Sequence, residues 1–309
     1  MSTTAGPVTP TLSLGIPSFG TAPGGGWRGL LDLGRMAEDA GIDRVIVPDH
    51  VVNGPDVADY PWGRFPTAPD GHWLEPLTVL TGIAGVTDRL RLGTGVLIAP
   101  LRPAPLLAKQ AATLDVVSNG RLDLGVGSGW QRAEFEAFGL DFSQRGQLLT
   151  DTIGACRALW EGQPASFTSA SVSFTDIFCS PSPAQARLPV WFSGTLHARN
   201  VTRIVELGDG WIPIMGSTTD DVRAGVAALA TAFADAGRSP EHLQVRHALP
   251  AVRAHDGRVD LAATMAPVPT LIEAGVTDVH ASLQAFDRNL TDPAATCQAL
   301  VAAFQGEVG

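Results

Sequence analysis

Short apolar runs alternate with amphipathic stretches along almost the whole chain. Residues 44–47 illustrate the first kind, because three consecutive β-branched residues (Val45, Ile46 and Val47) are typical of a strand buried in a parallel sheet. Residues 30–40 illustrate the second kind, with apolar side chains recurring at helical spacing before Gly41. The pattern predicts eight strands, at 12–16, 44–47, 90–98, 122–126, 189–192, 210–214, 243–252 and 276–283.

Each of these strands is followed by a predicted helix. The expected helices cover residues 30–40, 75–86, 103–117, 131–138, 145–161, 196–207, 219–236, 261–274 and 293–304. Eight alternating strand–helix units predict an α/β fold of the (β/α)₈ TIM-barrel type in preference to a doubly wound open sheet.

One segment departs from this alternation. Residues 166–168 and 172–174 resemble the two arms of a small hairpin, so residues 162–188 are expected to form an insertion after strand 4. We expect a single domain over residues 1–309, with the barrel running from about residue 12 to residue 304.

The predicted fold indicates where the chemistry lies, since (β/α)₈ barrels carry their active sites in the loops after the strands. The residues expected at or just beyond the carboxyl ends of the predicted strands, and therefore near this site, are Asp49, His50, Gly95, Val96, Ser128, Gly129, Trp130, Ser193 and Gly194. His50 is the best acid/base candidate because an imidazole titrates near neutral pH. A purely structural histidine is the alternative.

The stretch 121–130 carries alternating glycines between a strand and a helix. Backbone N–H groups at a helix N-terminus favour an anion, so this turn is a candidate phosphate site. A tight turn without a ligand fits the residues equally well. A dinucleotide fingerprint would need glycine at Trp130, and no Walker A pattern occurs, so a flat ligand bearing a phosphate remains the hypothesis.

The long loop over residues 51–74 is rich in aromatic side chains. Loops of this length are often functional. The aromatic residues form either a lid and substrate wall or a small satellite core beneath the loop: Tyr60, Trp62, Phe65 and Trp73.

Composition narrows the class of protein. Hydrophobic residues make up 45% of the 309 residues and charged residues 17%, which describes a well-buried globular protein. The net charge of −10 argues against nucleic acid or an anionic membrane as partner. Residues 1–10 lack the features of a signal peptide and no apolar run approaches the length of a membrane span, so we expect a cytoplasmic protein.

Several kinds of chemistry find no support in the sequence. Lys109 is the sole lysine, which leaves no other candidate for Schiff-base catalysis, and the three cysteines are too far apart for a disulfide framework or a zinc pattern. No convergent metal-ligand cluster and no G-x-S-x-G elbow occur, so we expect no metal and no serine hydrolase. An organic cofactor is the natural remaining source of reactivity.

Four motifs in order resemble the bacterial luciferase-like monooxygenase superfamily. They are residues 93–96, residues 125–139 with Arg145, residues 209–211, and residues 48–52, the last of which resembles its deazaflavin-dependent branch. The resemblance extends from about residue 12 to residue 304.

This resemblance implies a barrel that binds coenzyme F420, or alternatively FMN, at the carboxyl ends of its strands. The bend at Gly95-Val96 would contain a non-prolyl cis peptide behind the cofactor ring. Asp49 and His50 would lie beside the ring, with His50 next to the carbon that exchanges hydride. Ser128, Gly129, Ser193 and Gly194 would bind the phosphate and the sugar-alcohol arm.

One position departs from the family pattern. Sugar-phosphate dehydrogenases of the family place a catalytic glutamate where this chain has Trp130, and they carry lysines that this chain lacks, so that activity is not expected. An indole at this position would stack on the ring or line the substrate pocket.

The expected function is F420-dependent hydride transfer to or from a fairly apolar organic substrate, with His50 as the catalytic residue. Tyr60, Trp62, Phe65 and Trp73 are the expected substrate-binding residues. The alternatives are an FMN-dependent monooxygenase that uses oxygen, and a non-catalytic flavin-binding barrel. The expected partners are a small-molecule substrate, a reductase that supplies reduced flavin or F420, and a second copy of the chain in a homodimer.

Overall fold

A computed structural model describes residues 9–23 and 26–309. Residues 1–8, which include most of the N-terminal segment expected not to be a signal peptide, lie outside the described residues, as do residues 24 and 25 of the loop after the first strand.

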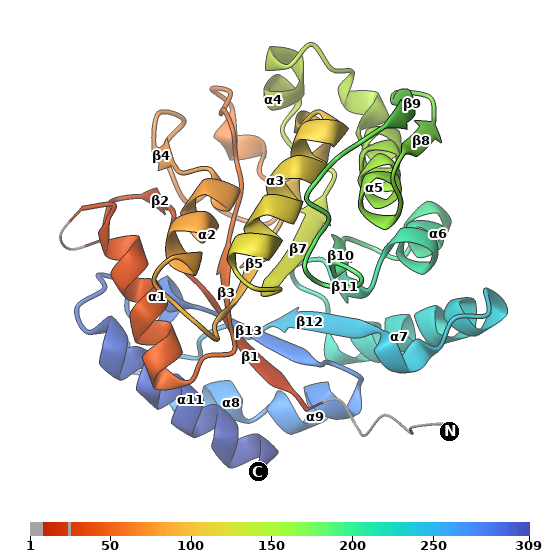
Figure 1. The fold of residues 1–309 in the computed structure, drawn as a ribbon. Coiled ribbons are helices and arrows are strands. Elements are labelled where there is room, and N and C mark those ends of the chain that lie inside the picture. The colour runs from red at the N-terminus through yellow and green to blue at the C-terminus, as the bar shows by residue number, and fades with distance from the viewer. Residues whose placement is uncertain (1–8, 24–25) are drawn as a thin grey trace.

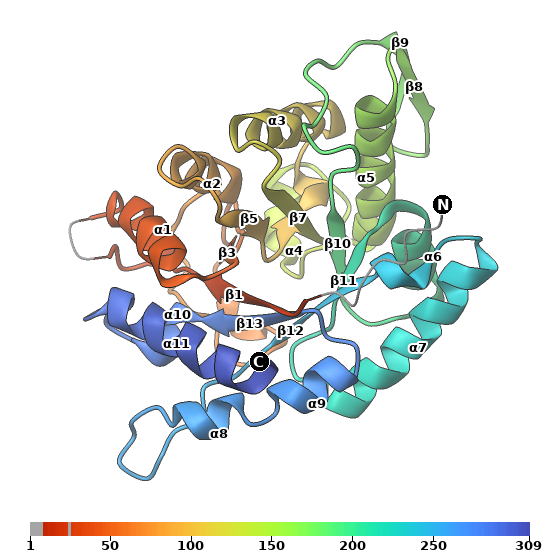
Figure 2. The same ribbon diagram turned by 60° about the horizontal axis from the view of Figure 1, so that its bottom comes forward.

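Eight parallel strands close into a barrel. The hydrogen-bonded order follows the sequence around the ring, and β10 pairs with β7 to close it. The strands are β1 (Thr11–Gly15), β3 (Arg44–Val47), β5 (Arg91–Thr94), β7 (Leu122–Gly127), β10 (Val190–Ser193), β11 (Gly210–Ile212), β12 (Gln244–Ala248) and β13 (Asp278–Ser282). Helices surround this ring (Figure 2), so the predicted (β/α)₈ barrel is confirmed.

The helices lie close to the predicted ranges. They are α1 (Gly29–Ala40), α2 (Pro76–Ala84), α3 (Ala104–Val117), α4 (Arg132–Ala137), α5 (Arg145–Glu161), α6 (Ala198–Leu207), α7 (Thr219–Asp235), α8 (Leu261–Met265), α9 (Val268–Glu273), α10 (Leu283–Phe286) and α11 (Pro293–Val308). Local sequence explains several of the boundaries. Thr218 and Asp221 form a capping box that starts α7, and Pro103 precedes α3.

Two predicted elements are divided in the structure. The helix expected over residues 261–274 is interrupted near Pro267, because proline has no N–H to continue the helical hydrogen bonds. The strand expected over residues 90–98 splits into β5 and the short β6 (Leu97–Ile98) at Gly95-Val96. β6 still pairs with β7.

The segment after the fourth barrel strand contains the predicted hairpin. β8 (Ala165–Thr168) and β9 (Ser173–Ile177) pair antiparallel and lie beside α5, at the outer edge of the molecule (Figures 1 and 2). A second small pair, β2 (Phe19–Gly20) with β4 (His72–Trp73), ties the long aromatic loop to the end of the first strand. The short helical turns η1 (Val57–Asp59), η2 (Ala99–Leu101), η3 (Phe142–Gln144) and η4 (Pro240–His242) complete the connections.

The barrel separates an apolar exterior layer from a charged interior layer. Side chains such as Val45 and Leu92 face the helices and belong to the main core. Inside the barrel, near the amino ends of the strands, Nε of Arg44 lies 2.7 Å from Oδ2 of Asp123, and its Nη1 lies 2.8 Å from Oδ2 of Asp278. Together with Arg246, which donates from Nε to Oδ2 of Asp278 at 2.5 Å, these residues form what we call the charged floor.

The ion pairs of the charged floor determine the protonation state of its carboxyl groups. Burial alone would raise the pKa of Asp123, but the guanidinium groups of Arg44 and Arg91 outweigh burial and hold this pKa at about 2. The guanidinium group of Arg246 also lies over the ring of Trp191, 4.6 Å from its centroid. The floor therefore closes the barrel with paired charges where many barrels use branched apolar side chains.

Within residues 9–23 and 26–309, no helix is both long enough and apolar enough to span a bilayer.

Candidate active site

The carboxyl ends of the strands open at one end of the barrel, where the aromatic loop with β4 and the helix α4 also lie (Figure 1). The peptide bond between Gly95 and Val96 is cis, as the resemblance implied. A Cβ atom at Gly95 would lie 2.3 Å from Cγ2 of Ile46 on the neighbouring strand. Glycine at this position therefore lets two strand ends approach closely behind the site.

The ends of β7 and β10 lie side by side, which brings Ser128 and Ser193 into one region. Val126 pairs in register with Phe192, and a Cβ atom at Gly127 would lie 3.0 Å from Oγ of Ser193. Gly129 has a φ of 74°, in the left-handed region that favours glycine. Because Gly194 donates its N–H to the carbonyl of Ile212 at 3.0 Å, this amide is engaged within the protein, and the hydroxyl groups are the more available ligands here.

His50 is held by two side chains that come from the glycine-rich turn and from α4. Its Nδ1 lies 3.2 Å from Oε2 of Glu134, and its Nε2 accepts a hydrogen bond from the indole Nε1 of Trp130 at 3.3 Å. Oε1 of Glu134 also accepts from the N–H of Val51 at 2.7 Å. Since an indole N–H can only donate, Nε2 is the acceptor and a neutral ring carries its proton on Nδ1.

The carboxylate of Asp49 is directed away from His50. Nη1 and Nη2 of Arg102 donate to its two oxygens at 2.6 and 3.0 Å, and the N–H of Ile98 donates to Oδ2 at 2.8 Å. Burial raises the pKa of Asp49, against the opposing effect of the guanidinium group. Arg102 also bonds to Glu75, which caps α2. Asp49 thus fixes the segment that follows the cis bend.

The aromatic residues of the long loop pack over His50. Its ring centroid lies 5.2 Å from that of Phe65, 4.8 Å from that of Trp73 and 5.9 Å from that of Trp130. Tyr60 contacts the rings of Phe65, Trp130 and Trp62. We call Tyr60, Trp62, Phe65, Trp73 and Trp130 the aromatic cap. Burial within this cap raises the pKa of the Tyr60 hydroxyl.

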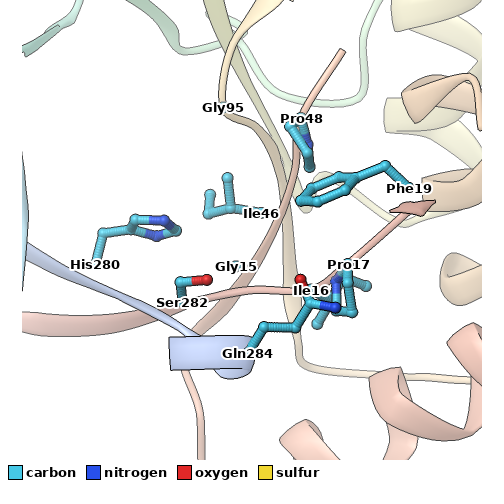
Figure 3. Close-up of a pocket in the computed structure, with 10 residues that line it drawn as sticks. All are labelled: Gly15, Ile16, Pro17, Phe19, Ile46, Pro48, Gly95, His280, Ser282 and Gln284. Atoms are coloured by element: carbon cyan, nitrogen blue, oxygen red, sulfur yellow. The ribbon is translucent and has the colours of Figure 1, made fainter. Parts of the chain in front are cut away.

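Two hollows lie among residues that follow the barrel strands. One has a volume of about 180 Å³ and lies among the ends of β1, β3 and β13, with Gly95 and His280 in its lining (Figure 3). Phe19 lines it and stacks on Trp73 of the aromatic cap with a centroid distance of 4.6 Å. The other, of about 490 Å³, is lined by Thr195, which is the residue after Gly194, by Trp211 and by residues of α7.

The structure adds residues that sequence reasoning did not identify. Glu134 lies within one of the family motifs, but Glu136 lies there too, and only burial separates them, since Glu134 is buried and Glu136 is exposed. Arg102 and His280 carry no local sequence signal. Within the described chain, no group of three or more His, Cys, Asp or Glu side chains is arranged to hold a metal ion. The three cysteines are buried and free.

Comparison with known proteins places the chain in a family. The sequence model described as luciferase-like monooxygenase matches residues 11–290. An uncharacterized protein of Mycobacterium tuberculosis (strain ATCC 25618 / H37Rv), Rv0953c, is 31% identical over 277 residues, which cover 87% of this chain and 91% of that protein.

Solved structures share the fold at low sequence identity. The monooxygenase RslO1 from Streptomyces bottropensis superposes with a TM-score of 0.79 at 17% identity, covering 97% of this chain and all of that one (100%). The coenzyme F420-dependent tetrahydromethanopterin reductase from Methanopyrus kandleri superposes with a TM-score of 0.72 at 16% identity, with coverage of 97% and 100%. The chain therefore belongs to the luciferase-like monooxygenase family and is an enzyme of the oxidoreductase class.

Proposed function

We propose that this protein transfers a hydride between coenzyme F420 and a fairly apolar organic substrate, with His50 as the donor or acceptor of the proton that accompanies the hydride. The observation that carries the proposal is the environment of His50: a buried carboxylate at Nδ1, an indole N–H at Nε2, and a position directly after β3 at the mouth of the barrel.

The residues at the strand ends fit a flat cofactor with a phosphate-bearing arm. Gly95 and Gly127 leave the ends of β5 and β7 without side chains, as a planar ring lying close to the backbone requires. Ser128 and Ser193 offer hydroxyl groups beside that surface, and the hollow lined by Thr195 gives an extended arm room to continue. A deazaflavin bound there supplies the hydride donor or acceptor.

The chain's own residues then have distinct tasks. Glu134 orients the imidazole and sets its tautomer, in the way that a carboxylate orients a catalytic histidine in other enzymes. Trp130 covers Nε2, so proton transfer at this nitrogen requires the indole to move aside. Tyr60, Trp62, Phe65 and Trp73 exclude water from the hydride and contact the substrate. Asp49 and Arg102 keep the segment after Val96 in place behind the ring.

Titration of the purified protein with F420 and, separately, with reduced FMN tests the cofactor. Tight binding of F420 with weak binding of FMN supports the proposal. His50→Ala should leave F420 affinity within a few-fold and reduce turnover strongly, because the variant removes the proton carrier but none of the groups proposed to bind the arm. Unchanged turnover in His50→Ala would refute the assigned role.

The second candidate is an FMN-dependent monooxygenase that receives reduced flavin from a partner reductase and activates oxygen. It is favoured by the same glycine-lined strand ends, which suit either ring. Oxygen consumption with reduced FMN, and none with reduced F420, would select it. A non-catalytic flavin-binding barrel is the third; it predicts binding with no turnover on any substrate.

We further propose that the chain forms a homodimer. An exposed stripe of α3 that includes Leu106 and Val117 supports this, because these side chains are 51% and 56% exposed although they are apolar. Sedimentation of the wild type and of Leu106→Glu tests it: the wild type should be dimeric and the variant monomeric.

A further inference from the structure

The smaller cavity at the barrel mouth has two chemically different sides. Figure 3 shows Ser282 and Gln284 near its lower edge and the ring of His280 facing across it. These three come from β13 and α10, and we call them the polar edge. The opposite side is apolar and comes from β1, β3 and the turn after β1, with Ile46 and Phe19 among its residues.

His280 lines this cavity and has hydrogen-bonding capacity that no described residue uses. Its Nδ1 is buried and has no hydrogen-bond partner among the described residues. Because Nδ1 has almost no accessible surface, a ligand in the cavity bonds to this nitrogen only if the ring turns, and such a bond would satisfy a buried polar atom whose unpaired state is costly. The ring also lies close against the backbone of β1: a Cβ atom at Gly15 would be 2.9 Å from Cε1 and 3.1 Å from Nε2 of His280. The His280 ring fits against β1 because Gly15 has no side chain.

The cavity presents no full charge to a ligand. Its ten lining residues, all within the described chain, include no lysine, arginine, aspartate or glutamate. The poor hydration of the His280 ring and the nearby positive charge of Arg246 lower the pKa of His280 to about 4, so this ring is neutral at pH 7. Because burying an unpaired ionic group is expensive, an ammonium or carboxylate is disfavoured.

We propose that this cavity binds the oxygen-bearing end of a small neutral substrate, a ketone, an aldehyde or an alcohol. The polar edge bonds to the substrate oxygen, and the hydrocarbon part packs on Ile46 and Phe19. Calling the ligand a substrate rests on the proposed function, since the cavity opens beside Gly95 and adjoins the aromatic cap through Phe19.

The first experiment measures binding of six-membered-ring probes that differ in one substituent. Ligand-detected NMR gives dissociation constants for cyclohexanone, cyclohexanol, cyclohexylamine and cyclohexanecarboxylate with the cofactor-free protein at pH 7. The ketone and the alcohol should bind at least tenfold more tightly than the amine and the carboxylate. Equal binding of all four probes, or no binding of cyclohexanone up to about 100 mM, which lies above the millimolar range expected for such small ligands, overturns the proposal.

Substitutions in the polar edge assign the binding to this cavity. Ser282→Ala and Gln284→Leu should each weaken cyclohexanone binding by about three- to tenfold, the effect of one neutral hydrogen bond. Both side chains are at least partly exposed, so these variants should fold even if His280→Phe does not. Gln305→Leu, at an exposed position of α11, is the matched control and should bind as the wild type does. Wild-type affinity in both edge variants contradicts the assignment.

Titrations of the same variants with F420 and with FMN show whether the polar edge binds the carbonyl group of a substrate or a carbonyl group of the cofactor ring. Weaker cyclohexanone binding with unchanged cofactor affinity supports a substrate site. Weaker cofactor binding with unchanged cyclohexanone affinity means that the polar edge contacts the carbonyl groups of a cofactor ring; this overturns the substrate assignment and leaves the proposed function standing. A third outcome is that neither cofactor binds the wild type, while cyclohexanone binding is still weakened by the substitutions in the polar edge. In that case the proposed function fails, but the cavity remains a binding site for a neutral, oxygen-bearing ligand.

Discussion

A buried carboxylate oxygen of Glu134 lies 3.2 Å from Nδ1 of His50, although the two residues are 84 positions apart in the sequence. The same carboxylate accepts the N–H of Val51, so it fixes both the side chain and the backbone of the segment that follows β3. This contact turns a histidine at a strand end into one with a defined tautomer and orientation.

Replacing Glu134 with glutamine should impair catalysis without removing the side chain. An amide has one acceptor oxygen, so it cannot accept from both Nδ1 of His50 and the N–H of Val51 in the present arrangement. We expect turnover to fall by at least about tenfold, and by up to roughly 10⁴-fold, the loss measured when the orienting carboxylate of a catalytic histidine becomes an amide. Nitrogen-15 NMR of histidine-labelled protein should show a larger fraction of the tautomer protonated at Nε2.

Glu136→Gln is the control for this experiment, because Glu136 belongs to the same helix and is exposed. Equal losses in the two variants, or an unchanged tautomer in Glu134→Gln, would argue against the positioning role of Glu134.

Trp130→Phe should expose Nε2 of His50. The variant keeps an aromatic ring but removes the indole N–H that donates to this nitrogen at 3.3 Å. Modification of His50 by diethylpyrocarbonate, followed by peptide mass spectrometry, should be several-fold faster than in the wild type. Trp62→Phe alters the same aromatic cap at a residue that packs on Tyr60, and it should leave the rate unchanged. A rate in Trp130→Phe no higher than in Trp62→Phe would show that the indole does not protect His50.

Asp123→Asn should destabilise the barrel at neutral pH. Loss of one partner from a buried ion pair leaves the guanidinium group of Arg44 less compensated, at a cost of about 3–5 kcal/mol. The folded-state pKa of Asp123, about 2, lies below its ordinary value of 3.8, so the unfolded chain binds more protons between these values. The contribution is therefore complete above pH 4 and is lost as the pH falls through 2.

Urea unfolding at pH 7 and at about pH 3 tests this prediction, because the difference between the wild type and Asp123→Asn should be smaller at the lower pH. Asp235→Asn, at an exposed position near the end of α7, should match the wild type at both values. A variant difference that does not change with pH would contradict the ion-pair origin of the effect.

His280 should remain neutral well below the range in which most histidines titrate. Its pKa of about 4 in the folded state lies below the ordinary value of 6.5, so the unfolded chain binds more protons between these two values. Stability from the neutral ring is therefore complete above pH 6.5 and decreases as the pH falls toward 4. An NMR titration of the His280 ring gives its midpoint directly, and the acid-induced loss of stability should be smaller in His280→Phe than in the exposed-site control His242→Phe. A midpoint near 6.5 would contradict this assignment.

The barrel could be predicted because the evidence for each strand and each helix lies within its own stretch of sequence. Each strand and helix has its own periodicity, and the order of the units determines the topology. Pro267 was also visible in the sequence, yet the helix around it was predicted as continuous. The charged floor was not predicted, since Arg44 opens a run that otherwise reads as apolar, and its partner Asp123 lies 79 positions away. The same limit applies to Glu134 and to Arg102, whose roles depend on contacts between distant segments.

The charged floor has a consequence for the order of events at the other end of the barrel. Since Arg44, Asp123, Arg246 and Asp278 plug one end, a molecule enters and leaves the interior only by the mouth. If a cofactor and a substrate bind one above the other in this interior, the deeper ligand can leave only after the other has left. Steady-state kinetics should then show an ordered mechanism, in which one ligand always binds before the other.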